Sequence, residues 1–332
     1  MIRYGCACTL ALTLVAALPA PAAGMRTHAE MSERMVARFL DHPEAMLPGL
    51  HPLFAPAARR GTFYSGSMWP DTGYEGLYPH AAETAHWRPF QDTYADLLRA
   101  SLVWPLNAAD QRRLVFFLGA VAHGVQDVPW HFSIGGHKSL TQMVEENDPG
   151  NPSLFEPLGD IYLHNSEALE PPLPAAFDWD LETAGAALAQ HGVAVAPELL
   201  AQGAQRHERL WTAAAYAGFV PALAMGDPFP WLRENQVRYY YGGVDHAAAL
   251  TAMWTRYFYA RTGGWHYYQQ MPEYGRSGAG YVPYRGVQDT TLLQAQPTHD
   301  AGGEPWLTLG NPAAAERRLL VRFDLRDVPP DT

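Results

Sequence analysis

The chain has 332 residues with 34 acidic and 23 basic side chains, so its formal net charge is −11. A surface that binds duplex nucleic acid is usually basic, so this balance disfavours nucleic acid as a partner. Aromatic residues make up 12% of the chain, which is enough for a sizeable hydrophobic core. The length exceeds that of a typical single domain and predicts one large domain with a smaller one.

The first residues have the layout of a secretory signal peptide, with Arg3 before a short apolar stretch and small residues up to Gly24. This predicts a signal peptide over residues 1–24 and a secreted or periplasmic protein. Both cysteines, Cys6 and Cys8, lie within it, so the mature chain is expected to have no disulfide. No later segment offers the roughly 20 apolar residues that a membrane span needs.

Apolar residues recur at helical spacing through most of the chain up to about residue 265. The segment Ala108–Val128 is apolar on nearly every face, which is typical of a helix at the centre of a domain. The segment from Pro48 to His80 has no sustained period, and its Gly and Pro residues predict a long structured loop. Helices are expected at residues 27–40, 90–102, 108–128, 154–168, 181–190, 197–219, 228–241 and 244–259.

The helical spacing of apolar residues ends with the expected large domain, residues 25–265. A linker is expected over residues 266–286. Two or three strands cannot close a sandwich, so residues 287–332 are expected to be the start of a truncated β-sandwich module. The predicted fold class is therefore an all-α multi-helix domain followed by an incomplete β-sandwich-like segment. Short strands are expected at residues 289–292, 306–309 and 318–325.

The strongest local signal for chemistry is the stretch from His123 to His131. His123 and Asp127 are four residues apart and project from one face of the helix, and His131 follows just past Pro129, which is expected to kink or end it. Imidazoles and a carboxylate suit zinc, and a carboxylate can bridge two ions. Without a metal these groups would be buried in an apolar helix and short of partners, so a metal site is favoured.

Three further candidates lie upstream: His28, Asp71 and His86. Each alone fits a capping, turn or surface residue. Together with the helix stretch they make an ordered set of His, Asp and His followed by His-x3-Asp-x3-His. His246, His207 and the remaining histidines show no consistent spacing and are expected to be structural.

Five segments, in sequence and in order, resemble the zinc-dependent phospholipase C family, and within it the catalytic domains of glycosylphosphatidylinositol-specific phospholipases D. The resemblance spans residues 25–265 and implies an all-α domain with a cluster of about three zinc ions at the bottom of a cleft. The segments are Thr27–His28, Gly66–Asp71, Thr84–Phe90, Phe117–His131 and Tyr241–Asp245.

The resemblance also implies how the ligands are shared. His28 and Asp127 would hold one ion. A second ion beside it would be held by Asp71, His86, His123 and again Asp127. Asp71 is also expected to be the catalytic residue that orients or deprotonates the attacking water, whose pKa zinc lowers towards about 7.

His131 would hold the third ion, where the family shows a histidine four residues before an acid. The best match here is Glu156 with Asp160, while Asp160 with His164 is a competing pair on the same helix face. Glu156 and Asp160 are placed first among the candidates, against the alternative that they form an ordinary solvated helix face.

The expected activity is that of a zinc-dependent phosphoric diester hydrolase of the phospholipase C or D type, acting on phospholipids or glycosylphosphatidylinositol. Trp69, Trp87 and Trp130 are expected near the site, either facing lipid or as core residues. Contact with a membrane surface and carbohydrate contact through the C-terminal module are also expected. Headgroup, cleaved bond and oligomeric state do not follow from the sequence.

Two alternatives stay open. A zinc-dependent single-strand nuclease could use the same chemistry on a helical scaffold, and stacking aromatics beside basic residues would favour it. A non-catalytic secreted binding protein could keep metal for structure only, and closed zinc coordination with no position for water would favour that reading.

Overall fold

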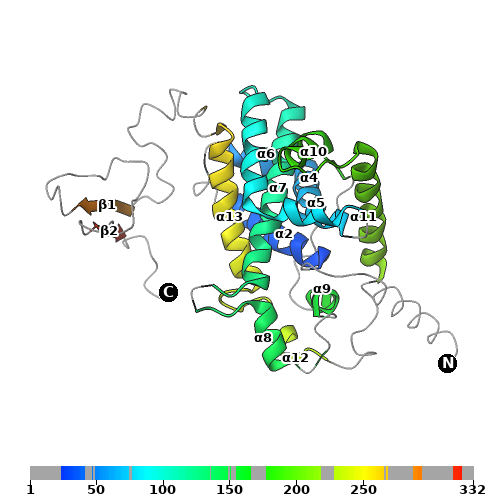
Figure 1. Cartoon of the computed structure of the whole chain (residues 1–332). Helices are drawn as coiled ribbons and strands as arrows, with labels where there is room; N and C mark the ends of the chain where they lie inside the picture. The colour runs from blue at the N-terminus through cyan, green and yellow to red at the C-terminus, as the bar shows by residue number, and fades with distance from the viewer. Residues whose placement is uncertain are drawn as a thin grey trace. The chain divides into compact units, whose positions relative to one another are not determined.

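The computed structural model divides the chain into two units, Met1–Gln270 and Met271–Thr332, and each is described by itself (Figure 1). Residues 1–23, nearly all of the predicted signal peptide, and the predicted strand at 306–309 lie outside the described residues. The structure describes residues 24–41, 47, 49–74, 77–134, 136–148, 150, 155–165, 177–217, 228–264, 267, 287–293 and 317–323.

The described part of the first unit is helical, and its only strand-like feature is one bridge between Ile134 and His137. The all-α prediction is therefore confirmed for this part of the chain. The elements are α2 (Met25–Asp41), α3 (Leu50–Phe54), α4 (Ala57–Met68), the 3-10 helix η2 (Trp69–Gly73), α5 (Pro79–His86), α6 (Arg88–Ser101), α7 (Ala108–His131), α8 (Leu140–Asn147), α9 (Phe155–Asn165), α10 (Leu181–Gln190), α11 (Pro197–Ala217), α12 (Pro230–Asn235) and α13 (Val244–Arg261).

The predicted helices are present with shifted ends, but the predicted loop between Pro48 and His80 is wrong. That segment contains α3, α4, η2 and the start of α5. The Gly and Ser residues that hide the helical period of α4 are buried against other helices, so small size there reflects close packing. The helix predicted over 228–241 is shorter, because α12 ends at Asn235 and turns follow. α8 was not predicted.

Helix α7 lies at the centre of the first unit and packs against α2, α4, α5, α6 and α13 (Figure 1). The Asn107 side chain caps its start by accepting hydrogen bonds from the backbone amides of Ala109 and Asp110 at 2.9 and 3.0 Å. The helix continues through Pro129 to His131. Proline lacks a backbone N–H, so Pro129 removes only one hydrogen bond of the helix. Near the helix end this loss is small, and the last turn persists.

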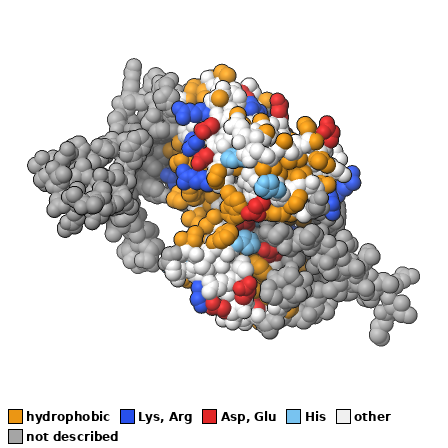
Figure 2. Space-filling model, in the orientation of Figure 1, with side chains coloured by type: hydrophobic (Ala, Val, Ile, Leu, Met, Phe, Trp, Pro, Cys, Tyr) orange, Lys and Arg blue, Asp and Glu red, His pale blue; other side chains and the backbone are white. Residues whose placement is uncertain are grey.

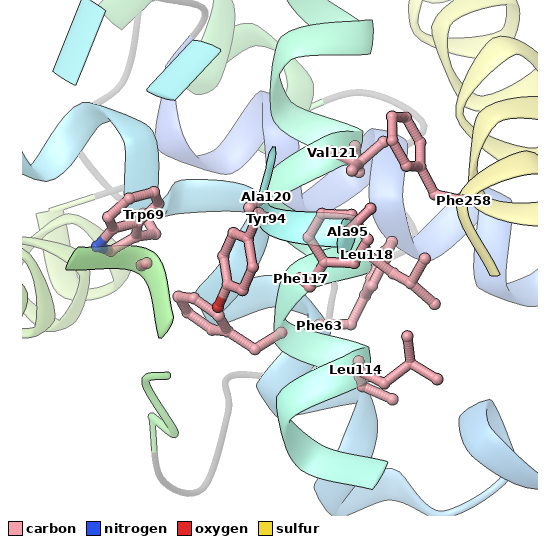
Figure 3. Packing of buried hydrophobic residues seen from close by; sticks show 14 of the residues in the cluster. Phe63, Trp69, Tyr94, Ala95, Leu114, Phe117, Leu118, Ala120, Val121 and Phe258 are labelled. Carbon is pink, nitrogen blue, oxygen red and sulfur yellow. The ribbon is translucent and has the colours of Figure 1, made fainter. Parts of the chain in front are cut away.

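Aromatic side chains from four helices fill the core around α7 (Figure 3). The ring of Phe117 on α7 lies 4.9 Å from that of Tyr94 on α6 and 5.5 Å from that of Phe258 on α13. Phe63 from α4 is fully buried in the same cluster. Burial of each such side chain contributes about 1.5–3 kcal/mol, so this cluster fixes the helices that carry the candidate site.

A second, smaller core surrounds Trp130 near the end of α7. The Trp130 ring stacks on Phe155 of α9 at 6.3 Å, and Leu140 of α8 and Leu232 of α12 belong to the same cluster. This packing brings the first turn of α9 to the last turn of α7, where two candidate metal ligands lie.

Helices α4 and α7 touch backbone to backbone at Gly66 and Gly119. A Cβ atom on Gly66 would lie 2.0 Å from the carbonyl oxygen of Phe116, and one on Gly119 would lie 2.1 Å from that of Phe63. Real Cβ atoms do not approach backbone this closely, so only glycine permits the observed distance between the two helices.

The second unit contains two described strands, β1 (Val287–Leu293) and β2 (Arg317–Phe323), paired antiparallel with Val287 opposite Phe323. They lie close to two of the three predicted strands. The β-sandwich remains a prediction. Among the described residues of the whole chain, no helix has the length and apolar character to cross a membrane.

Substitution of Gly119 by alanine tests the helix contact. Gly119→Ala is expected to lower the free energy of unfolding by about 1–3 kcal/mol or more, because α4 and α7 must separate. Gly159→Ala on α9 is the matched control, since its Cβ would meet its nearest atom at an ordinary 3.4 Å. The control should be neutral or gain up to about 1 kcal/mol from helix propensity. Urea unfolding monitored by circular dichroism compares them, and equal losses would contradict this account.

Candidate metal centre

The carboxylate of Asp127 is the centre of a group of histidines contributed by three helices, α2, α5 and α7. It is buried, with 3% of its side chain exposed. Its Oδ2 lies 3.3 Å from His123 Nε2 and 3.4 Å from His86 Nε2, while its Oδ1 lies 3.4 Å from His28 Nε2. The two oxygens therefore face different groups of ligand atoms, which is the arrangement needed to bridge two ions.

Asp71 from η2 completes a set of four around one point. Its Oδ1 lies 3.3 Å from His86 Nε2 and 3.5 Å from His123 Nε2, and the two Nε2 atoms are 2.9 Å apart. A tetrahedral zinc ion with ligands at about 2.0–2.1 Å would separate those ligands by about 3.3 Å. The distances from His86 and His123 to each other and to the two carboxylates thus fit ligands of a tetrahedral ion, and His86, His123 and Asp127 form one group that could hold a metal.

His28 on α2 reaches the same centre. Its ring stacks on that of His123 at 3.9 Å, and its ligand atom groups with those of Asp71 and His123 within 4.8 Å. The set His28 and Asp127, implied for a neighbouring ion, is therefore brought together by the fold.

His131 in the last turn of α7 has two acidic neighbours. Its Nε2 lies 3.7 Å from Asp127 Oδ1 and 3.8 Å from Glu156 Oε1 on α9. His131 is 23% exposed at its side chain and Glu156 is 8% exposed, so this is the more open end of the group. The structure brings His131 and Glu156 together, as expected for ligands of a third ion.

The hydrogen bonds on the far side of the rings orient the histidines for metal binding. The Nδ1 atoms of His123 and His86 lie 2.7 Å from the backbone carbonyls of Ser67 and Ala82, and a carbonyl can only accept. Each Nδ1 therefore carries the proton, and each Nε2 can present a lone pair to the centre. His28 Nδ1 lies 2.7 Å from Gln126 Oε1. Gln126, which the sequence did not single out, is thus a positioning residue.

The atoms that face the centre lack other partners. Within the described residues, these buried atoms have no hydrogen-bond partner: His28 Nε2, Asp71 Oδ1, Asp127 Oδ1 and His131 Nε2. Buried polar groups are rarely left unpaired, and four of them within one cluster are typical of a site that binds cations. The donor set of imidazole nitrogens and carboxylate oxygens suits zinc, so these residues fit the predicted ions.

The charges of the group shift the pKa values in opposite directions. Burial, together with the neighbouring His123, lowers the pKa of His28 to about 4. Burial also disfavours charge on His123, but the carboxylates of Asp71 and Asp127 outweigh burial and raise its pKa to about 10. Despite burial, His123 holds the pKa of both carboxyls below their usual range. In the metal-free group, His123 therefore stays positively charged at neutral pH, with a proton on each ring nitrogen.

Asp160, which was predicted to bind metal, is hydrogen-bonded to the start of α2, and no group of possible metal ligands among the described residues includes it. Its Oδ1 accepts hydrogen bonds from the backbone amide and hydroxyl of Thr27 at 2.8 and 2.7 Å, and its Oδ2 accepts one from the Arg26 amide at 3.1 Å. These are the unpaired amides at the start of α2. Asp160 therefore caps α2, the helix that carries His28. The side chain of its competing partner His164 lies outside the described residues.

His207 on α11 was expected to be an ordinary structural histidine, yet its surroundings are unusual. It is 2% exposed, and among the described residues neither of its ring nitrogens has a hydrogen-bond partner. Burial lowers its pKa to about 4, and the charges of Asp71 and His123 reach it. No local spacing in the sequence points to it, because α11 meets η2 only in the folded chain.

Two of the three tryptophans expected near the site are core residues. Trp69 and Trp130 are 2% and 0% exposed, which excludes a lipid-facing role for them in this conformation. Trp87 is partly exposed, and its Nε1 donates a hydrogen bond of 2.7 Å to Glu83, which also accepts one from Tyr74 at 2.5 Å. Trp87 and Tyr74 lie beside His86 and form one rim of the centre.

Comparison with known proteins bears on the same residues. Residues 27–173 match the family model described as zinc dependent phospholipase C. This part of the chain is therefore similar to the zinc-dependent phospholipase C family. The matched segment contains all eight residues predicted to bind metal, from His28 to Asp160.

Two curated relatives carry the name phosphatidylinositol-glycan-specific phospholipase D. The protein from Rattus norvegicus is 26% identical over 110 residues, and the one from Bos taurus is 26% identical over 113 residues. Each alignment covers 32% of this chain and 13% of the relative. No solved structure matches significantly. The family and the relatives support the predicted class, a zinc-dependent phosphoric diester hydrolase.

Zinc binding should release protons. His123 carries a proton at pH 7 to 9 because its pKa is raised to about 10, and it must lose that proton to bind metal through Nε2. His28, with its pKa near 4, is neutral in that range and has no proton on Nε2 to lose. Affinity should therefore increase as the pH rises towards 10. Calorimetric titration of the chelated protein with zinc, in two buffers of different ionisation enthalpy at pH 7.5, measures the release. A buffer-independent heat would contradict the assignment.

The variants Asp160→Asn and Glu156→Gln test whether Asp160 caps α2 while Glu156 binds metal. Asp160→Asn should keep the zinc content and lower the free energy of unfolding by about 1–2 kcal/mol, since an amide caps α2 less well than a carboxylate. Glu156→Gln should lose about one bound ion, as a neutral amide replaces an anionic ligand. Plasma emission and urea unfolding give both quantities. Metal loss in Asp160→Asn would restore Asp160 as a ligand.

Proposed function

We propose that this protein is a secreted zinc-dependent phosphodiesterase that hydrolyses phospholipids or glycosylphosphatidylinositol. The observation that carries the proposal is the placement of Asp127, whose two oxygens face separate groups of histidines in a domain of the phospholipase C family. About three ions are proposed. His28 and Asp127 would hold the first, and Asp71, His86, His123 and Asp127 would hold the second. His131 and Glu156 would hold the third.

The bound zinc would supply a Lewis acid for the phosphoryl oxygens and lower the pKa of an attacking water. Asp71 is the residue proposed to orient that water and accept its proton. Its side chain is 14% exposed, whereas that of Asp127 is 3% exposed, so Asp71 is the carboxylate of this pair that solvent reaches. Asp127 then holds the geometry, and Asp71 and His131 face the substrate side.

Partial exposure favours catalysis over a purely structural metal. A structural zinc site is closed by protein ligands, while a catalytic one keeps a position open for water. The exposed fractions of Asp71 and His131, 14% and 23%, support an open edge. This argues against the non-catalytic alternative. The acidic net charge of −11 argues against the nuclease.

Secretion is proposed from the signal-peptide layout of residues 1–24. Because the alignments cover 13% of each relative, a preference for glycosylphosphatidylinositol is the finer part of the proposal, together with the side of the phosphorus that is cleaved. Carbohydrate contact by residues 287–332 rests on sequence pattern alone.

Hydrolysis by the zinc-loaded full chain tests the proposal. Phosphatidylcholine, phosphatidylinositol and a glycosylphosphatidylinositol-linked protein should be tested before and after chelation, with single-stranded DNA as the nuclease control. Asp127→Asn should lose bound zinc and lower kcat/KM by more than about a hundredfold, beyond the usual cost of losing a residue behind a metal ligand. Asp96→Asn is the matched control, at a side chain that is 62% exposed.

The products identify the bond. Diacylglycerol with a phosphorylated headgroup indicates C-type cleavage, and phosphatidic acid with a free headgroup indicates D-type cleavage. A chain that binds zinc but cleaves only DNA, or no phosphodiester at all, would overturn the proposed substrate class.

A further inference from the structure

Exposed apolar side chains follow directly after the last ligand of the metal centre. Phe132 and Ile134 are 47% and 52% exposed, although most large apolar residues of the described chain are buried. Backbone hydrogen bonds in both directions between Ile134 and His137, at 3.1 and 3.0 Å, close this segment into a small hairpin. The hairpin therefore holds two apolar side chains outward at the end of α7.

Tyrosines from the turn before α13 support the hairpin from behind. Tyr241 donates a hydrogen bond of 3.2 Å to the carbonyl of Phe132, and Tyr239 donates one of 2.7 Å to the carbonyl of Lys138. Tyr240 is 62% exposed, and its ring lies 5.5 Å from that of His137. These residues form what we call the hairpin surface: Phe132, Ile134, His137, Lys138 and Tyr240.

The hairpin surface is continuous with the rim of the metal centre. His131 directly precedes Phe132, and the Phe132 ring packs edge-on against Trp87 at 5.5 Å. Trp87 in turn lies beside His86. In the face of the molecule drawn in Figure 2, histidine and acidic side chains lie next to one another among apolar side chains. A molecule held at the hairpin surface is therefore next to the open end of the centre.

The charge of this region differs from that of the chain. Acidic residues outnumber basic ones by 34 to 23 overall, yet residues 128–144 and 235–244 contain no aspartate or glutamate. They contribute Lys138, which is paired with Glu146 of α8, and the exposed Arg238. A surface with apolar tips, a tyrosine at their side and no acid in its own segments matches a phospholipid headgroup layer, where phosphates repel carboxylates.

We propose that the hairpin surface docks the protein on the surface of a phospholipid bilayer, with Phe132 and Ile134 inserted below the headgroups and Tyr240 at their level. The docked orientation directs the edge formed by His131 and Asp71 towards the lipid phosphates. The choice of a lipid surface over a protein partner rests on the proposed function, because that reaction requires contact with aggregated lipid.

Binding to phosphatidylcholine vesicles tests this directly. The zinc-loaded full chain and its chelated form should both be sedimented with sucrose-loaded vesicles. Ile134→Ser should lower the partition coefficient roughly tenfold, since it removes a buried aliphatic side chain from the bilayer. Ile134→Trp should raise it about threefold or more, because tryptophan favours the interface. Met253→Ser on α13, at a position 54% exposed, is the matched control and should bind as the unaltered protein does.

Hydrolysis separates docking from the shape of the site. Ile134→Ser should lower the cleavage of vesicles about as much as it lowers binding, and should leave cleavage of short-chain phosphatidylcholine below its micellar concentration unchanged. Thermal unfolding confirms that the variants are folded. Opposite changes in the serine and tryptophan variants cannot come from misfolding alone.

The outcomes are distinct. Vesicle binding that does not change in either Ile134 variant, or that falls equally in Met253→Ser, would overturn docking even if the protein hydrolyses monomeric lipid. Binding that depends on Ile134 without hydrolysis of any phosphodiester would keep docking and overturn the proposed function. A shift from dimer to monomer in Ile134→Ser on gel filtration, with unchanged vesicle binding, would assign the surface to a second copy of the chain and overturn docking.

Discussion

The contact between the backbones of α4 and α7 at Gly66 and Gly119 determines where the metal ligands can lie. Ser67 follows Gly66, and its backbone carbonyl accepts a hydrogen bond from Nδ1 of His123, which lies one turn beyond Gly119. Gly124 on α7 likewise permits close contact with the end of α5, since a Cβ on Gly124 would lie 2.0 Å from the carbonyl oxygen of His86. Small residues thus set the position of His123, because the Ser67 carbonyl of α4 can orient its ring only when α4 and α7 touch.

The close packing creates an electrostatic problem that a metal solves. Asp71 and Asp127 are carboxylates within a group of histidines that are almost fully removed from water. Burying charge is costly unless opposite charge compensates it. Without metal, compensation comes from a proton on His123, whose pKa is raised to about 10. Divalent ions would supply more positive charge and would also satisfy the unpaired atoms of His28 and His131.

Exposure differs among the candidate ligands of the group. The His28 side chain is 0% exposed, Asp71 is 14% exposed and His131 is 23% exposed, and the exposed hairpin begins at the next residue. The buried end fixes geometry because Gln126 and the capping of α2 by Asp160 hold His28. The open end is where a phosphodiester could enter. One helix, α7, therefore connects the rigid ligands, the substrate side and the apolar surface.

The sequence by itself determined the central helix and the three candidate ligands on it, because a spacing of four residues places His123, Asp127 and His131 on one face whatever surrounds them. It did not determine α4, since small residues conceal helical periodicity when they face another backbone. Only tertiary structure decided between Glu156 and Asp160, which occupy one face of α9 four residues apart. Glu156 meets His131, and Asp160 meets the free amides at the start of α2. That difference comes from how α9 packs between α7 and α2, which no local pattern contains.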